Sequence, residues 1–168
     1  MFRVAAFDCF GTVFDASGLP RELVKAYVAH VNAENFSPFE FPQEWYELPA
    51  HPDSAEGIRR LRAGGIRCVT LSNGSRALLE ALSNRAGIEW DAIIDLAAHR
   101  VYKPNQRAYR TVELETGATP GESLMVTANK TFGDVEGASS IGMGWILIRQ
   151  PEEFWPASIV EFAELLGF

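Results

Sequence analysis

Short apolar runs alternate with longer amphipathic stretches along most of this chain. Apolar runs bounded by glycine and polar turn residues are typical of buried strands. We predict five such strands, at residues 3–7, 66–71, 92–96, 124–127 and 145–148. In the stretches between them, apolar residues recur at the spacing of a helix with one buried face. We predict helices at residues 20–35, 53–63, 76–86, 105–116, 132–140 and 157–166.

This alternation predicts an α/β fold, because helical crossovers join the strands of a parallel sheet. We expect a doubly wound, Rossmann-like sheet of five parallel strands flanked by helices. Asp53 begins one predicted helix, where its side chain could cap the first turn. Residues 36–52 do not follow this alternation, because aromatic residues and prolines follow one another there without a clear period. We expect this segment to be irregular.

Composition narrows the class of protein. The 168 residues suit one domain, and 47% of them are hydrophobic, which is enough for an ordinary core. The formal net charge of −7 argues against a nucleic-acid surface and against an acidic membrane as partner. No apolar run approaches the ~20 residues that a membrane span needs. Met1 leads directly into the first strand, so we expect no signal peptide, and Cys9 and Cys68 as reduced thiols of a cytoplasmic protein.

Polar segments follow four of the predicted strands, at residues 8–12, 72–75, 99–103 and 127–134. In parallel α/β sheets, ligands bind beyond the carboxyl ends of the strands, so we expect these segments to gather around one site. Asp8 follows an apolar strand directly, and a carboxylate in that position can act as a covalent nucleophile. Taken alone, an aspartate there is more typical of a turn.

The other polar features are also ambiguous when each is taken alone. The SNGS segment at 72–75 offers donors for an anion, or it caps the next helix. Lys103 is a natural partner for a carboxylate nucleophile, or a solvated surface lysine. Asn129 and Asp134 could belong to the predicted ligand site, or they could be ordinary turn residues.

Together, these motifs resemble the haloacid dehalogenase (HAD) superfamily. The resemblance rests on AAFDCFGTVFD at 5–15, LSNGS at 71–75, VYKPNQRAY at 101–109 and MVTANKTFGDVEGA at 125–138. It implies a hydrolase with Asp8 as the nucleophile, Ser72 and Lys103 beside it, and an acidic loop at 129–134. It also implies an α/β core over residues 1–15 and 53–168, with a small, reduced cap insert over residues 16–52 after the first strand.

Two departures from the phosphatases of this superfamily favour its L-2-haloacid dehalogenase-like group. Those phosphatases carry a second Asp, which protonates the leaving alkoxide, where this chain has Phe10. They also hold Mg²⁺ with carboxylates of the fourth loop, where this chain has Asn129 and keeps only Asp134. The dehalogenases share three features with this chain. They have an aromatic residue at the position of Phe10, an SNGS loop, and a tyrosine six residues after the lysine, here Tyr109.

The dehalogenase resemblance implies hydrolytic dehalogenation of a small anionic 2-haloacid through an aspartyl ester, with no required cofactor. In that reaction Asp8 displaces the halide, Thr12 aims Asp8, Lys103 neutralises and orients it, and Asp134 activates the hydrolytic water. The implied substrate-binding residues are Phe10, Ser72, Asn73, Tyr109 and Asn129.

Two further departures keep other functions open. The dehalogenases have a cap arginine that helps to bind substrate and halide, but this chain has no arginine between Arg21 and Arg59. Asn129 and Asp134 also have the wider spacing of the phosphatases. One alternative is a Mg²⁺-dependent small-molecule phosphatase with a degraded metal site, where Asp8 and Asp134 would hold the ion. The other is a non-catalytic HAD-fold binding domain. The aromatic residues of the insert either line a pocket for an apolar substrate or, as is more typical, pack the insert onto the core or form a homodimer contact.

Overall fold

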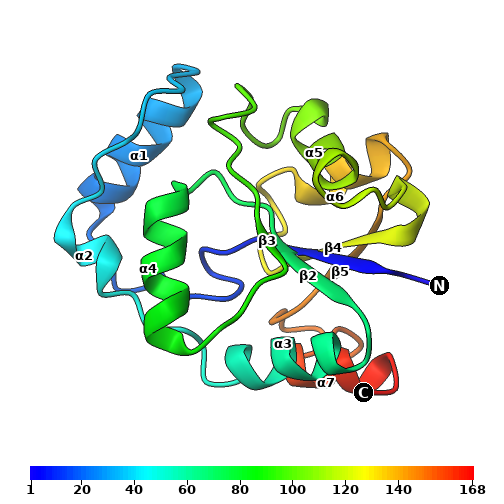
Figure 1. Cartoon of the computed structure of the whole chain (residues 1–168). Helices are drawn as coiled ribbons and strands as arrows, with labels where there is room; N and C mark the ends of the chain where they lie inside the picture. The colour runs from blue at the N-terminus through cyan, green and yellow to red at the C-terminus, as the bar shows by residue number, and fades with distance from the viewer.

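The computed structural model describes residues 1–168 and has a five-stranded, all-parallel sheet at its centre (Figure 1). The strand order is β3-β2-β1-β4-β5, so the first strand lies in the middle of the sheet. The strands are β1 (Val4–Phe7), β2 (Arg67–Thr70), β3 (Ala92–Ile93), β4 (Ser123–Thr127) and β5 (Gly144–Leu147). The predicted α/β fold with five parallel strands flanked by helices is confirmed.

Helices cover both faces of the sheet. They are α1 (Arg21–Asn32), α2 (Gln43–Tyr46), α3 (Ser54–Ala63), α4 (Arg76–Ala86), α5 (Gln106–Thr116), α6 (Asp134–Ser140) and α7 (Ile159–Leu165), with a 3-10 turn at Pro120–Glu122. Ala5 and Phe7 of β1 point into a core made with α3, α4 and α7. Val4 and Ala6 point into a second core made with α5 and α6. This alternation follows from the period of two along a strand, and it explains why β1 is apolar throughout.

Residues 16–52 form α1, α2 and the loops around them, and Figure 1 shows both helices to one side of the sheet, near α4. None of the residues of α1 is fully buried. Aromatic packing holds this segment together, because the ring of Tyr27 lies 5.1 Å from that of Trp45 and 5.3 Å from that of Phe41. The ring of Trp45 in turn lies 5.0 Å from that of Phe10, which ties the segment to the loop after β1.

The ends of several helices differ from their predicted bounds by one to three residues, and other departures concern β3, α2 and Asp53. β3 ends at Ile93, because the next amide, Ile94 N–H, donates to the Thr70 hydroxyl at 3.2 Å instead of extending the ladder. The segment predicted to be irregular contains the short helix α2. The predicted capping of α3 by Asp53 is wrong, since its side chain makes no capping bond. Its carboxylate instead accepts bonds from the Arg149 guanidinium at 2.8 and 3.0 Å.

None of the helices combines the length and the apolar character that crossing a membrane requires.

Candidate active site

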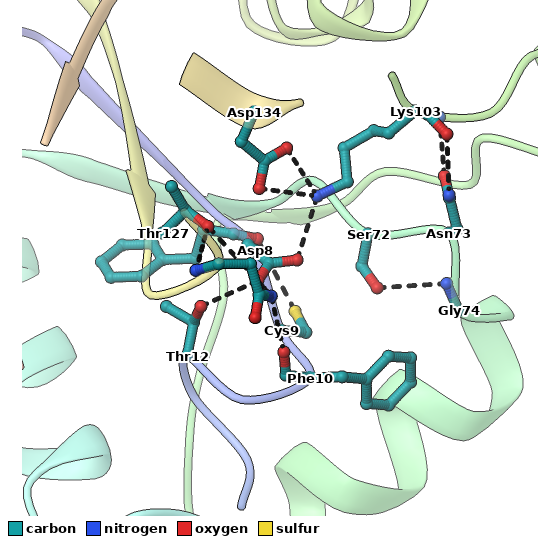
Figure 2. Close-up of polar contacts among 12 residues, drawn as sticks. Asp8, Cys9, Phe10, Thr12, Ser72, Asn73, Gly74, Lys103, Thr127 and Asp134 are labelled. Carbon is teal, nitrogen blue, oxygen red and sulfur yellow. Dashed lines mark hydrogen bonds and ion pairs between the residues drawn. The ribbon is translucent and has the colours of Figure 1, made fainter. Parts of the chain in front are cut away.

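Asp8 stands at the carboxyl end of the central strand, where the chain turns sharply out of the sheet. The turn is built on the Cys9 carbonyl, which accepts backbone bonds from residues 12, 13 and 14. Gly11 takes the left-handed conformation (φ +87°) that side chains disfavour, so a glycine suits this position. The turn returns Thr12 to Asp8, and the Thr12 hydroxyl donates to Asp8 Oδ2 at 2.8 Å (Figure 2). Thr12 is fully buried, so this bond is shielded from water and fixes the orientation of the carboxylate.

The two oxygens of the Asp8 carboxylate have very different surroundings. Oδ2 accepts from Thr12, from the Asn129 side-chain amide, and from the Thr127 hydroxyl at 3.5 Å. Oδ1 accepts only from the Lys103 ammonium, at 3.0 Å. Because a carboxylate oxygen has about two lone-pair sites, Oδ2 is saturated and Oδ1 keeps a free one. Oδ1 is therefore the atom of Asp8 that can attack a substrate.

Lys103 reaches from the loop after β3 to both acidic side chains of the site (Figure 2). Its Nζ lies 3.0 Å from Asp8 Oδ1 and 3.0 Å from Asp134 Oδ1, and its side chain is almost completely buried. Burial alone would lower the pKa of Lys103, but the two carboxylates outweigh it and raise that pKa above its ordinary value. The site therefore holds a permanent ammonium shared between two carboxylates.

Burial raises the pKa of Asp8 above its ordinary value, and the Lys103 charge opposes that shift. The negative charge of Asp134 adds to the effect of burial. Lys103 is thus the main group that favours the ionised, nucleophilic form of Asp8.

The side chain of Asn73 holds the Lys103 loop in place. Its Oδ1 accepts from the Lys103 backbone N–H at 2.7 Å, and its Nδ2 donates to the Lys103 carbonyl at 3.0 Å. These two bonds fix the orientation of the amide, and one side-chain N–H is left to donate. Asn73 therefore keeps its backbone N–H and one side-chain N–H available for a substrate.

Asp134 begins helix α6, and its side chain is held from behind by Tyr109. The Tyr109 hydroxyl donates to Asp134 Oδ1 at 2.8 Å. Tyr109, a predicted substrate contact, is completely buried behind Asp134 and does not line the cavity beside Asp8. The close approach of α6 requires Gly137, because a Cβ there would lie 2.1 Å from the Tyr109 ring. Asp134 Oδ2 carries only a long contact to Lys103, at 3.4 Å, and is the freer oxygen.

Four backbone N–H groups beside Asp8 donate to no partner within the protein. They belong to Cys9, Phe10, Ser72 and Asn73, at the carboxyl ends of β1 and β2. Unpartnered amides in buried surroundings are rare, because each costs the free energy of a lost hydrogen bond. The Ser72 hydroxyl accepts from Gly74 N–H at 3.1 Å, which leaves its own proton free to donate. This set of donors is suited to a carboxylate or another small anion.

A cavity of about 390 Å³ opens above these groups. Its wall includes predicted site residues Asp8, Phe10, Ser72, Asn73, Lys103, Asn129 and Asp134. The Phe10 ring packs against Gly74, where a Cβ would lie 2.8 Å from it. The remaining wall comes largely from residues 16–52, including Val24, Tyr27 and Val28 of α1. The sequence motifs did not identify these α1 residues, because an apolar helical stripe is ordinarily a packing surface.

The residues do not fit a Mg²⁺ ion between Asp8 and Asp134. The Lys103 ammonium already lies within 3.0 Å of both carboxylates, where a cation would be bound. Asn129 directs its amide nitrogen at Asp8, and a donor group cannot ligate a cation in that orientation. No group of three or more His, Cys, Asp or Glu side chains is positioned to hold a metal.

Sequence reasoning also missed Arg149, which braces the nucleophile loop from outside. Its Nε donates to the Thr12 carbonyl at 2.9 Å, while its guanidinium pairs with Asp53. Arg149 has a left-handed backbone (φ +58°), which is strained for a residue with a side chain. No local pattern marks this residue, because its partners lie far away in the chain.

Comparisons with known proteins agree with this geometry. A family model described as haloacid dehalogenase-like hydrolase matches residues 40–142. An (S)-2-haloacid dehalogenase of Xanthobacter autotrophicus is 33% identical over 136 residues, which are 79% of this chain and 52% of that protein. The chain spans about half the length of the curated relatives it matches.

Solved structures show the same fold at lower identity. The L-2-haloacid dehalogenase of Xanthobacter autotrophicus with covalently bound chloropropionic acid superposes with a TM-score of 0.77, at 21% identity over 99% of both chains. A HAD phosphatase from Thermococcus onnurineus superposes with a TM-score of 0.68, at 18% identity over 99% of this chain and 98% of the other. At such identities the likeness concerns the fold alone, since one fold serves many reactions.

Proposed function

Because this chain belongs to the haloacid dehalogenase-like hydrolases, we propose that it hydrolyses the carbon–halogen bond of small 2-haloacids through an ester on Asp8. The observation that carries this proposal is the pairing of a buried carboxylate nucleophile with Lys103, with Phe10 in place of an acid two residues after the nucleophile. A halide leaves without being protonated, so the reaction needs no general acid at position 10. A phosphate monoester would need one.

In the first step, Asp8 Oδ1 attacks C2 of the substrate. A C–O bond forms, the C–halogen bond breaks with its electron pair, and the halide leaves as an anion. The substrate carboxylate lies against the free N–H groups of Cys9, Phe10, Ser72 and Asn73. Residues 16–52 act as the cap that shields this step from bulk water.

In the second step, water attacks the carbonyl carbon of the Asp8 ester. The bond between the acyl carbon and Oδ1 breaks, and the 2-hydroxyacid leaves with Oδ1 as its hydroxyl oxygen, which receives the proton taken up by Asp134. Asp8 is regenerated with an oxygen from the water, and its remaining proton passes to solvent. Asp134 Oδ2 takes the proton of the attacking water, because this oxygen is the less engaged one and Tyr109 holds the side chain in place. No step requires a metal ion or an organic cofactor.

A paired assay tests the proposal on the purified protein. Chloride or bromide release from (S)-2-halopropionate is measured beside phosphate release from an aryl phosphate, each with and without chelator. We expect halide release that is insensitive to chelator and absent in Asp8→Asn. Phosphate turnover abolished by chelator would favour the phosphatase, and the absence of both activities would favour a binding domain.

A further inference from the structure

The cavity beside Asp8 carries charge at only one end. Of the 18 residues that line it, Asp8, Lys103 and Asp134 are the only charged ones, and all three stand at the carboxyl ends of the strands. The formal charges sum to one excess negative charge, because a single ammonium faces two carboxylates. The wall from residues 16–52 is mainly apolar and includes no cation.

A departing halide must move toward that uncharged wall. Displacement at carbon is in line, so the leaving group departs on the side opposite Asp8 Oδ1. The ammonium of Lys103 cannot follow it, because Lys103 lies on the Asp8 side and is bound by both carboxylates. The halide therefore gives up much of its hydration for an apolar surface, a cost that rises steeply for small anions.

Tyr27 offers a hydroxyl donor on this wall, and Trp45 Nε1–H is a second donor there without a partner. Tyr27 lines the cavity, and its hydroxyl makes no hydrogen bond within the protein. Four rings surround it, those of Phe10, Phe39, Phe41 and Trp45, so its position is well defined. Burial, reinforced by the charge of Asp8, raises the pKa of Tyr27 well above its ordinary value, so the hydroxyl stays protonated and can donate.

We propose that this wall selects the leaving group, with Tyr27 donating a hydrogen bond to the halide and no cation assisting its departure. The inference rests on the proposed dehalogenase function. Weakly hydrated bromide and iodide should leave far more readily than chloride. The ratio of the bromide rate to the chloride rate should exceed the ratio for the same displacement by acetate ion in water, because water stabilises chloride well.

The test compares kcat/KM for 2-bromopropionate and 2-chloropropionate, because kcat/KM reports on the steps up to halide loss. The same bromide-to-chloride ratio is measured for displacement by acetate in water. Asn32→Arg places a cation on the wall, since Asn32 lines the cavity at the end of α1. Ala29→Arg is the matched control, because Ala29 is exposed on the same helix and does not line the cavity.

We expect the wild-type ratio to exceed the ratio in water by about tenfold, because chloride loses more stabilisation than bromide on leaving water, by about the worth of one charge-assisted hydrogen bond. Asn32→Arg should bring it toward the ratio in water and make chloride a stronger product inhibitor. Tyr27→Phe, which keeps the ring, should increase the ratio, while Ala29→Arg should leave it unchanged. Halide release with a ratio equal to that in water, unmoved by Asn32→Arg and Tyr27→Phe, would overturn this inference alone. No halide release from any 2-haloacid would overturn the proposed function as well.

Discussion

Replacing Asp53 by Asn should destabilise the fold by about 2 kcal/mol at neutral pH and by much less in strong acid. The carboxylate accepts two bonds from the Arg149 guanidinium, at 2.8 and 3.0 Å, and one from Ile159 N–H at 2.7 Å. The two side chains are only 18% and 15% exposed. Breaking a fully buried ion pair costs about 3–5 kcal/mol, and partial exposure together with the surviving amide oxygen lowers this figure.

The pH dependence follows from the pKa of Asp53. Burial alone would raise it, but the bonds from Arg149 and Ile159 outweigh burial and hold the pKa of Asp53 below its ordinary value of 3.8. A carboxyl whose pKa is lower in the folded state stabilises the fold above its unfolded pKa. That contribution disappears as the pH falls below 3.8 and through the folded pKa. The wild type should therefore lose its advantage over Asp53→Asn in this range.

Urea denaturation of both proteins at pH 7 and at a series of pH values below 4 measures the difference in free energy of unfolding. Glu56→Gln is a suitable control, because the pKa of Glu56 is lowered to about 2 by exposed arginines that water screens. It should change the free energy of unfolding little. A destabilisation of Asp53→Asn that is the same at pH 7 and in strong acid would refute this account of the Arg149 pair.

Two further predictions concern the site. Lys103→Met removes the charge that opposes the raised pKa of Asp8, so the acid limb of the pH profile of kcat/KM should move to higher pH and activity should fall. Lys25→Met, an exposed control, should match the wild type, and an unshifted profile in Lys103→Met would contradict the assigned role. Gly137→Ala puts a methyl group 2.1 Å from the Tyr109 ring and should destabilise the fold by about 1–3 kcal/mol in thermal unfolding. Unchanged stability would show that α6 can shift.

The sequence predicted the sheet well because its inner strands β1 and β4 are buried on both faces, and such strands are continuous apolar runs. The motifs after the strands also predicted that Asp8, Lys103 and Asp134 would meet, since parallel strands end at one edge of the sheet. Each of these inferences depends on a local pattern and a general rule of topology.

Other features depend on contacts between distant residues and have no local pattern. Asp53 has the residue type and position of a helix cap, yet its carboxylate binds Arg149, which lies 96 residues away. Tyr109 resembled a ligand contact because of its spacing from Lys103, but the tertiary fold places it behind Asp134. The packing of α1 over the site decides the character of the cavity wall, and an amphipathic stripe alone does not specify which surface it faces.

The three donors on Asp8 Oδ2 acquire a second use once the proposed ester has formed. Oδ1 is then bonded to substrate carbon, and Oδ2 becomes the carbonyl oxygen of the ester. Thr12, Asn129 and Thr127 already point at this atom, so they form an oxyanion hole before any charge develops there. When water adds to the ester, the negative charge collects on Oδ2 among these fixed dipoles, which need no rearrangement to stabilise it. The network that holds the nucleophile still in the first half of the reaction thus lowers the barrier of the second.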